Sequence, residues 1–145
     1  MKAFRIITHP FILSLTFMLI LISGEQIGGF YLWYLLLALP HGSVHAVTGF
    51  LGIVILLFNG IKSKQLSRDA LTACINLLGG SLMWLSLFLF FYNDKSNYNI
   101  STFYELVPLI ALLIFVSISI CFFVDNILLL LKNSNNKIHK PSVHE

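Results

Sequence analysis

Two histidines in an apolar stretch are the residues of this sequence best suited to chemistry. His41 and His45 are four positions apart, so on a helix they share one face, which Thr48 continues. Two histidines at this spacing can bind one metal ion or haem iron, or pass protons. The pattern predicts a metal site, a pore or proton relay, or a pair of histidines hydrogen-bonded to neighbouring helices. No cofactor is expected on the last reading, and iron or haem on the first.

The residues around His41 carry a resemblance to a known family. Leu39-Pro40-His41-Gly42-Ser43-Val44-His45 resembles the Pro-His-Gly-Ala-x-Asp-His stretch of the retinal-forming, membrane-bound carotene dioxygenases. The resemblance implies that His41 is an iron ligand. It covers residues 39–45 alone, and the acidic residue of the family pattern is missing here.

Two further polar residues lie inside apolar runs. Asn76 and Asp125 are each about six residues from the same end of their predicted helices, so they are expected at one depth, where they can meet. Ionisable groups in a bilayer usually face a partner or a water-filled cavity. Asp125 is therefore paired with Asn76, extended toward Lys132 at the membrane surface, or part of an ion or proton pathway.

Small residues accompany these polar positions and predict close helix packing. Glycine and alanine let helix backbones approach each other in a membrane. The candidates for helix packing are Gly42, Ala46, Gly49, Gly52, Gly79 and Gly80.

Composition shows what must position these residues. The chain is 57% hydrophobic and 10% charged, too apolar for a soluble surface. Long unbroken apolar runs predict membrane-spanning helices rather than barrel strands. A single transmembrane domain is predicted over residues 1–131, with a short, basic, disordered tail over 132–145. Its helices are predicted at about 4–23, 30–58, 70–92 and 106–131.

The first two segments differ from a plain span. Residues 4–23 are predicted as a retained helix, although the same stretch also fits a cleaved secretory signal. A straight helix over 30–58 would be about 43 Å long, against an apolar core of roughly 30 Å. Pro40 removes a helical hydrogen bond within it. The predicted fold is therefore an all-α, integral membrane four-helix bundle whose second helix is kinked or broken at Pro40–Gly42.

Charge predicts the orientation of the bundle. Eight of the nine Lys and Arg lie at the N-terminus, between the second and third segments, or in the tail. Positive residues favour the cytoplasmic side, so both termini are expected in the cytoplasm of a cell (inner) membrane protein. Basic residues confined to helix ends do not form a nucleic-acid surface.

These features favour a non-enzymatic membrane protein that acts by assembly. Its partners would be the lipid bilayer and either a second copy or another membrane protein, in the manner of channel-like effectors, toxin-immunity proteins or small complex subunits. An intramembrane metal-dependent oxygenase using His41 and His45 on a lipid-like substrate is one alternative. A transporter or ion pathway through the Pro40–Gly42 break is the other.

Overall fold

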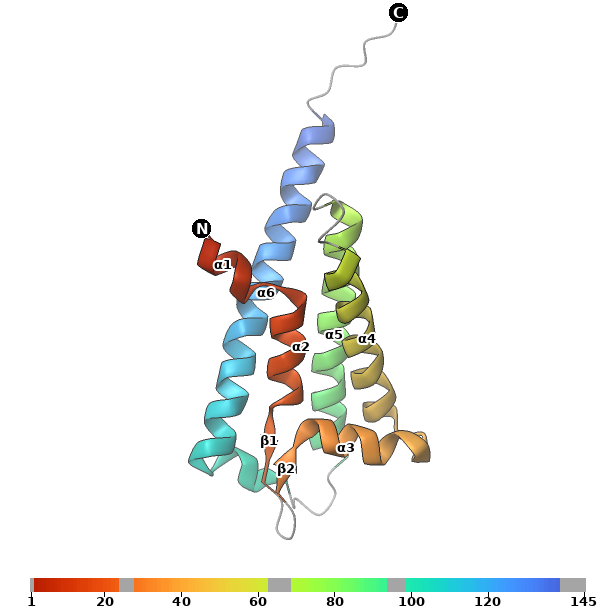
Figure 1. The fold of residues 1–145 in the computed structure, drawn as a ribbon, viewed down its shortest axis with the longest axis vertical. Coiled ribbons are helices and arrows are strands. Elements are labelled where there is room, and N and C mark those ends of the chain that lie inside the picture. The colour runs from red at the N-terminus through yellow and green to blue at the C-terminus, as the bar shows by residue number, and fades with distance from the viewer. Residues whose placement is uncertain (1, 24–27, 63–68, 94–98, 139–145) are drawn as a thin grey trace, which may run out of the picture.

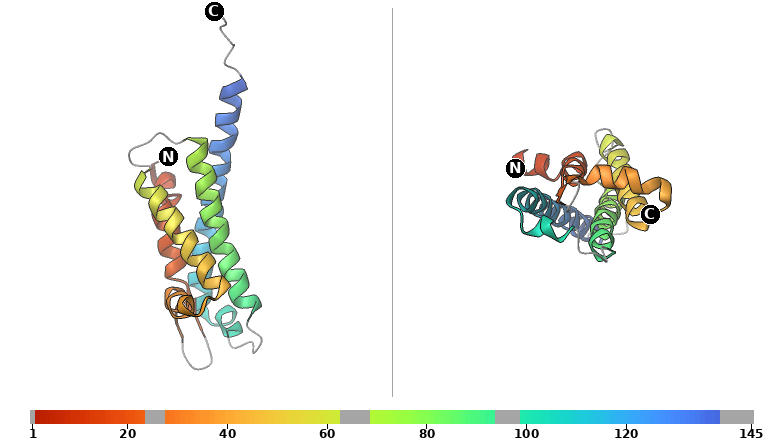
Figure 2. Two further views of the ribbon diagram at one scale, coloured as in Figure 1. Left: turned by 90° about the vertical axis from the view of Figure 1, so that its right-hand side faces the viewer. Right: turned by 90° about the horizontal axis from the view of Figure 1, so that it is seen from below.

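The chain forms an elongated bundle of helices with a small hairpin at one end (Figures 1 and 2). The computed structural model describes residues 2–23, 28–62, 69–93 and 99–138. The elements in order are α1 (Lys2–Ile7), α2 (Pro10–Met18), β1 (Leu21–Ile22), β2 (Gly29–Phe30), α3 (Tyr31–Ala38), the 3-10 turn η1 (Leu39–His41), α4 (Val44–Lys62), α5 (Ala70–Tyr92), the 3-10 turn η2 (Ile100–Phe103) and α6 (Leu106–Ile138).

Three of these helices are long and apolar enough to cross a membrane. They contain the stretches Val44–Ile61, Ala70–Tyr92 and Leu106–Ser134, with mean hydropathies of 2.0, 1.8 and 2.9. These helices support the assignment of the chain as a membrane protein. The prediction of four spanning helices is not confirmed. Three of the described helices have the required length and composition, and the described N-terminal segment contains short helices instead of a fourth.

The N-terminal segment differs from the single helix predicted over 4–23. α1 ends at Ile7, and α2 begins at Pro10 with the His9 ring nitrogen accepting the Phe11 amide at 3.3 Å. Proline has no amide hydrogen and collides with the preceding turn, so it begins a helix more readily than it continues one. Pro10 thus marks the point at which the predicted helix divides into two.

Beyond Met18 the backbone becomes extended instead of helical. β1 pairs with β2 in an antiparallel hairpin, and the Tyr31 amide donates to the Ile20 carbonyl at 2.7 Å. The Ser23 amide donates to the Thr102 hydroxyl at 2.9 Å. Non-helical backbone at membrane depth is tolerated where protein groups satisfy it. This extended strand therefore relies on hydrogen bonds from β2, α3 and η2.

The range 30–58 contains two helices of different direction. α3 lies across one end of the bundle, whereas α4 runs along it (Figures 1 and 2). Between them, η1 contains Pro40, and Gly42 takes a left-handed backbone conformation with φ of 67°. Glycine adopts this conformation without the steric penalty of a side chain. At the other end of the chain, α6 continues through residues 132–138 of the predicted tail, whose remaining residues lie outside the described part.

α4 and α5 pack with their backbones unusually close. A Cβ added to Gly52 would lie 2.8 Å from the Gly79 carbonyl oxygen, and one added to Gly79 would lie 2.8 Å from Leu56. Real Cβ atoms essentially never come this near to a neighbour. The two glycines therefore fix the distance between these helices, as small residues do in membrane proteins.

Gly52→Ala is expected to lower the stability of the protein, because the added methyl group meets backbone and must push α4 from α5. Overpacking of this kind typically costs about 1–3 kcal/mol. Gly60→Ala, also on α4, is the matched control, since its nearest neighbour is the Phe11 ring at 3.3 Å. Thermal unfolding in mild detergent measures both. Equal melting temperatures for Gly52→Ala and Gly60→Ala would contradict the close contact.

Candidate functional site

A chain of buried side-chain amides joins the three long helices. Asn59 on α4 donates from Nδ2 to Asn76 Oδ1 on α5 at 2.7 Å. Asn76 donates in turn to Asn126 Oδ1 on α6 at 2.8 Å, and Asn126 Nδ2 donates to the Phe122 carbonyl at 2.8 Å. We call Asn59, Asn76 and Asn126 the amide chain. It is a directional series of donors and acceptors that ends on helix backbone.

The amide chain sets the rotation and register of these helices. Its three residues are buried, with at most 7% of their surface exposed. Asn59 also donates to the Thr72 carbonyl at 3.0 Å, so one amide binds both the backbone and a side chain of α5. In an apolar interior, losing either bond would leave a polar group without a partner. The bonds therefore favour a single arrangement of α4, α5 and α6.

Asp125 lies beside the amide chain, but its hydrogen-bond partner is on another element. Asp125 Oδ2 accepts the Thr8 hydroxyl at 3.0 Å. The Asn76 amide donates to Asn126, the residue that follows Asp125 on α6. One residue further along α6 turns a side chain by about 100°. The acid thus faces the α1–α2 junction, while the amide faces α5.

A second polar group, which we call the serine clasp, lies nearer to α3. The Ser86 hydroxyl of α5 donates to the His45 carbonyl at 2.6 Å and lies 2.9 Å from the Tyr31 hydroxyl. Because Ser86 uses its hydrogen on His45, Tyr31 is the donor of the second bond. Burial raises the pKa of Tyr31 strongly, more than the bond to Ser86 lowers it. The phenol therefore remains a neutral donor that ties α3 to α5.

His45 and His41 have separate environments. The His45 ring packs edge-on against Phe90, with ring centroids 5.4 Å apart, and its buried Nε2 has no hydrogen-bond partner within the part of the chain that the structure describes. His41 is exposed in η1, with Nδ1 3.0 Å from the Leu37 carbonyl. Because the left-handed Gly42 lies between them, the two histidines do not follow one another on a continuous helix. Among the described residues, no group of three His, Cys, Asp or Glu could hold a metal ion.

The other predicted site residues have mainly local or packing roles. Thr48 Oγ1 bonds the Val44 and His45 carbonyls of its own helix at 2.9 and 3.0 Å. Ala46 is fully buried, and a Cβ on Gly49 would lie 2.5 Å from Ser86 Oγ. Gly80 faces Phe123, at 3.1 Å from the added Cβ. The predicted packing position Gly42 instead faces open space, and its contribution is the turn.

Several residues of these networks were not singled out from sequence. They are Thr8, Tyr31, Asn59, Ser86 and Asn126. Asn59 lies in the last turn of an apolar run, where a polar residue reads as the helix end meeting water. An uncharged amide within an apolar run is nevertheless a signal of a hydrogen bond between membrane helices. Tyr31 reads as an interfacial aromatic residue, although it is fully buried here.

Comparison with protein-family models, curated proteins and solved structures gives no match for this chain. The likeness to carotene dioxygenases therefore rests on residues 39–45 alone. In the structure these residues form η1, Gly42 and the start of α4, with His41 exposed and bonded to its own backbone.

A double-mutant cycle on Asn76→Ala and Asn126→Ala tests the amide chain. The stability losses of the two single variants should sum to more than the loss of the double variant. The reason is that each single variant already removes the bond between Asn76 and Asn126. The coupling should be about 0.6 kcal/mol, with an upper value near 1.7, as for hydrogen bonds between membrane helices. Thermal or denaturant unfolding in detergent supplies the four free energies.

Thr48→Val is the matched control for the cycle, because the Thr48 hydroxyl bonds two carbonyls of its own helix, α4. It should change stability little and should show no coupling with Asn126→Ala. Zero coupling between Asn76 and Asn126 would contradict the bond.

Proposed function

We propose that this chain is a non-enzymatic membrane protein that acts by assembling, with itself or with another membrane protein, through the outward face of α6. The supporting observation is the exposure of this helix. Its spanning stretch is the longest and most apolar of the three, yet 22% of it is buried within the chain, against 39% for each of the other two. A helix with this much free surface has room for a helix of another molecule.

The free surface of α6 has the spacing of a helix-packing seam. Seven exposed positions alternate at intervals of three and four residues, the period at which helices pack along their length. They are Ile110, Leu113, Ser117, Ile120, Val124, Ile127 and Leu131. Most are β-branched, so their side chains are stiff and lose little freedom on packing.

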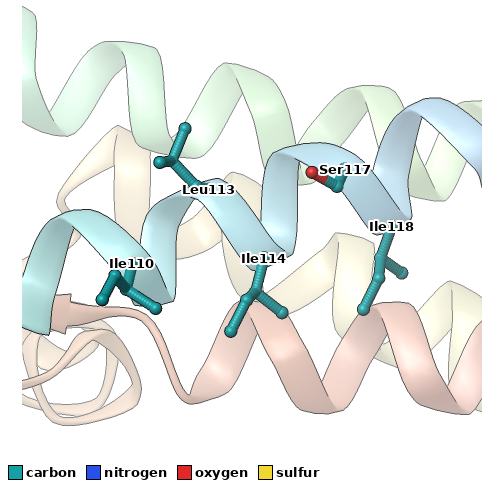
Figure 3. Close-up of a pocket in the computed structure, with 5 residues that line it drawn as sticks. All are labelled: Ile110, Leu113, Ile114, Ser117 and Ile118. Atoms are coloured by element: carbon teal, nitrogen blue, oxygen red, sulfur yellow. The ribbon is translucent and has the colours of Figure 1, made fainter.

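A shallow groove gives this face its shape. It is lined by Ile110, Leu113, Ile114, Ser117 and Ile118, all on α6 (Figure 3). Three isoleucines project from the same side of the helix (Figure 3). Ser117 is small and polar, so a partner helix can approach closely there and share a hydrogen bond.

The glycines that were predicted to pack helices explain why association is assigned to α6. Gly49, Gly52, Gly79 and Gly80 all face neighbours within this chain. Their surfaces are therefore used for internal packing, and association falls to α6 rather than to the glycine faces of α4 and α5.

The topology proposed with this function has both termini in the cytoplasm of a cell (inner) membrane protein. Three spanning helices alone would place the termini on opposite sides. However, α2 and the extended strand after it run along the bundle, so α1 lies on the side toward which α6 ends (Figure 1). Arg5 and Lys132 are exposed on these two elements, as the positive-inside rule requires.

Cysteine labelling tests this topology in a Cys74→Ala, Cys121→Ala background. Ile6→Cys and Ser134→Cys are expected to resist a membrane-impermeant maleimide on intact cells and to react after the membrane is opened. The native Tyr104 is 81% exposed, so Tyr104→Cys should react on intact cells. Labelling of Ile6→Cys and Ser134→Cys from opposite sides would contradict the proposal.

Ser117→Phe is expected to weaken assembly, because the ring fills the position of closest approach. Ser81→Phe, at an exposed serine on α5, is the matched control. Energy transfer between differently labelled copies in lipid vesicles measures self-association, and native mass in mild detergent detects another bound protein. A strictly monomeric chain without a bound partner, or equal effects of the two variants, would contradict the proposal.

A further inference from the structure

α3 combines a transverse direction with an open apolar surface. It lies across the end of α4 and α5 instead of along them (Figures 1 and 2). Tyr31 and Leu35 are buried against the bundle, at 0% and 2% exposure. Its outward side is apolar and open, with Trp33 58% and Leu37 71% exposed. The helix therefore needs an apolar surrounding on the side facing away from the protein.

The transverse direction of α3 is held by specific contacts. Tyr31 bonds Ser86 of α5 at 2.9 Å. The rings of Tyr31 and Tyr34 meet Phe90 edge-on, with centroids 5.1 and 5.4 Å apart. At the other end of α3, the turn through Gly42 redirects the chain into α4. Aligning α3 with α4 as one helix would break each of these contacts.

Helix length gives the depth of α3 in a membrane. α4 has 19 residues and α5 has 23, which corresponds to about 28 and 34 Å. The apolar core of a bilayer is roughly 30 Å thick. If α4 and α5 cross the core, α3, which lies at the end where α4 begins, is at the edge of that core.

Other exposed aromatic side chains gather at this end of the bundle. Tyr92 ends α5, and Phe103 and Tyr104 immediately precede α6, with exposed fractions of 74%, 41% and 81%. These helix ends lie at the same end as α3 (Figure 1). Tryptophan and tyrosine prefer the boundary between acyl chains and headgroups. Trp33, Tyr92 and Tyr104 all belong to the elements at this end of the bundle, as residues at such a boundary would.

We propose that α3 is an interfacial helix, lying parallel to the membrane surface at the boundary of headgroups and acyl chains. Its occupant is the lipid of that boundary, which contacts Trp33, Leu36 and Leu37. α4 and α5 also expose apolar side chains that lipid can cover, Val44 and Phe88 among them, so no separate partner is required. The proposal is independent of association through α6, because the two surfaces lie on different helices.

The two tryptophans of the chain allow a direct measurement of depth. Trp84→Phe leaves Trp33 as the single tryptophan, and Trp33→Phe leaves Trp84, near the middle of α5. Each variant is placed in phosphatidylcholine vesicles whose bromine atoms are high or low on the acyl chains. Trp33 should be quenched more by the high bromines and Trp84 more by the low ones.

A second route protects the test against misfolding. Trp84 donates to Ser119 Oγ at 3.2 Å, so Trp84→Phe removes an internal bond. Trp33 is exposed, so subtracting the signal of Trp33→Phe from that of the native protein isolates it without disturbing the core.

Three results would overturn the proposal. Stronger quenching of Trp33 by the low bromines would place α3 inside the core as part of a longer span. Quenching of Trp33 by aqueous iodide but not by lipid would place it in water. Protection from both quenchers would show that protein covers α3, and it would leave the α6 result unaffected.

Discussion

The close contact of α4 and α5 at Gly52 and Gly79 is the constraint on which the rest of the bundle depends. Because neither residue has a side chain, the two backbones approach until a Cβ built on Gly52 would lie 2.8 Å from the Gly79 carbonyl oxygen. This approach brings Asn59 within reach of Asn76 toward one end of the pair. Toward the other end it places Gly49 against Ser86, whose hydroxyl reaches the backbone of α4. Wider spacing would separate both polar groups, so packing and hydrogen bonding depend on the same contact.

The N-terminal segment shows how a helix too short to cross a membrane alone can belong to a bundle of longer helices. α2 has nine residues, about 13 Å, so it cannot cross an apolar core of roughly 30 Å alone. In the extended chain beyond α2, the backbone amide and carbonyl groups cannot bond one another as they do in a helix. Those groups are paired with β2 and with the Thr102 hydroxyl, while Ile20 and Ile22 are buried. Protein contacts thus replace the hydrogen bonds that a helix would have provided for itself.

Hydrophobic run length predicted some elements well and others poorly, for physical reasons. The third predicted helix, 70–92, agrees with α5, because an apolar run of one span's length with no internal proline has one favourable structure. Residues 4–23 are equally apolar, but burial of extended backbone against η2 and β2 depends on residues far away in sequence. The direction of α3 likewise depends on Tyr31 meeting Ser86. Asn76 was recognisable as a polar residue in lipid, whereas its partners depended on helix rotation, which a run of apolar residues leaves undetermined.

The arrangement of the polar side chains also bears on what the interior can do. An ion or proton pathway needs polar groups that can exchange partners with water or with the ion. In the amide chain each donor is directed at an acceptor on the next helix, and the series ends on a backbone carbonyl. An ion entering there would have to replace amide bonds that join α4, α5 and α6. Transport along this route would therefore require the helices to separate at the level where these hydrogen bonds connect them. The outward surfaces of α6 and α3 impose no such requirement, because lipid or a partner can cover them while the interior keeps its bonds.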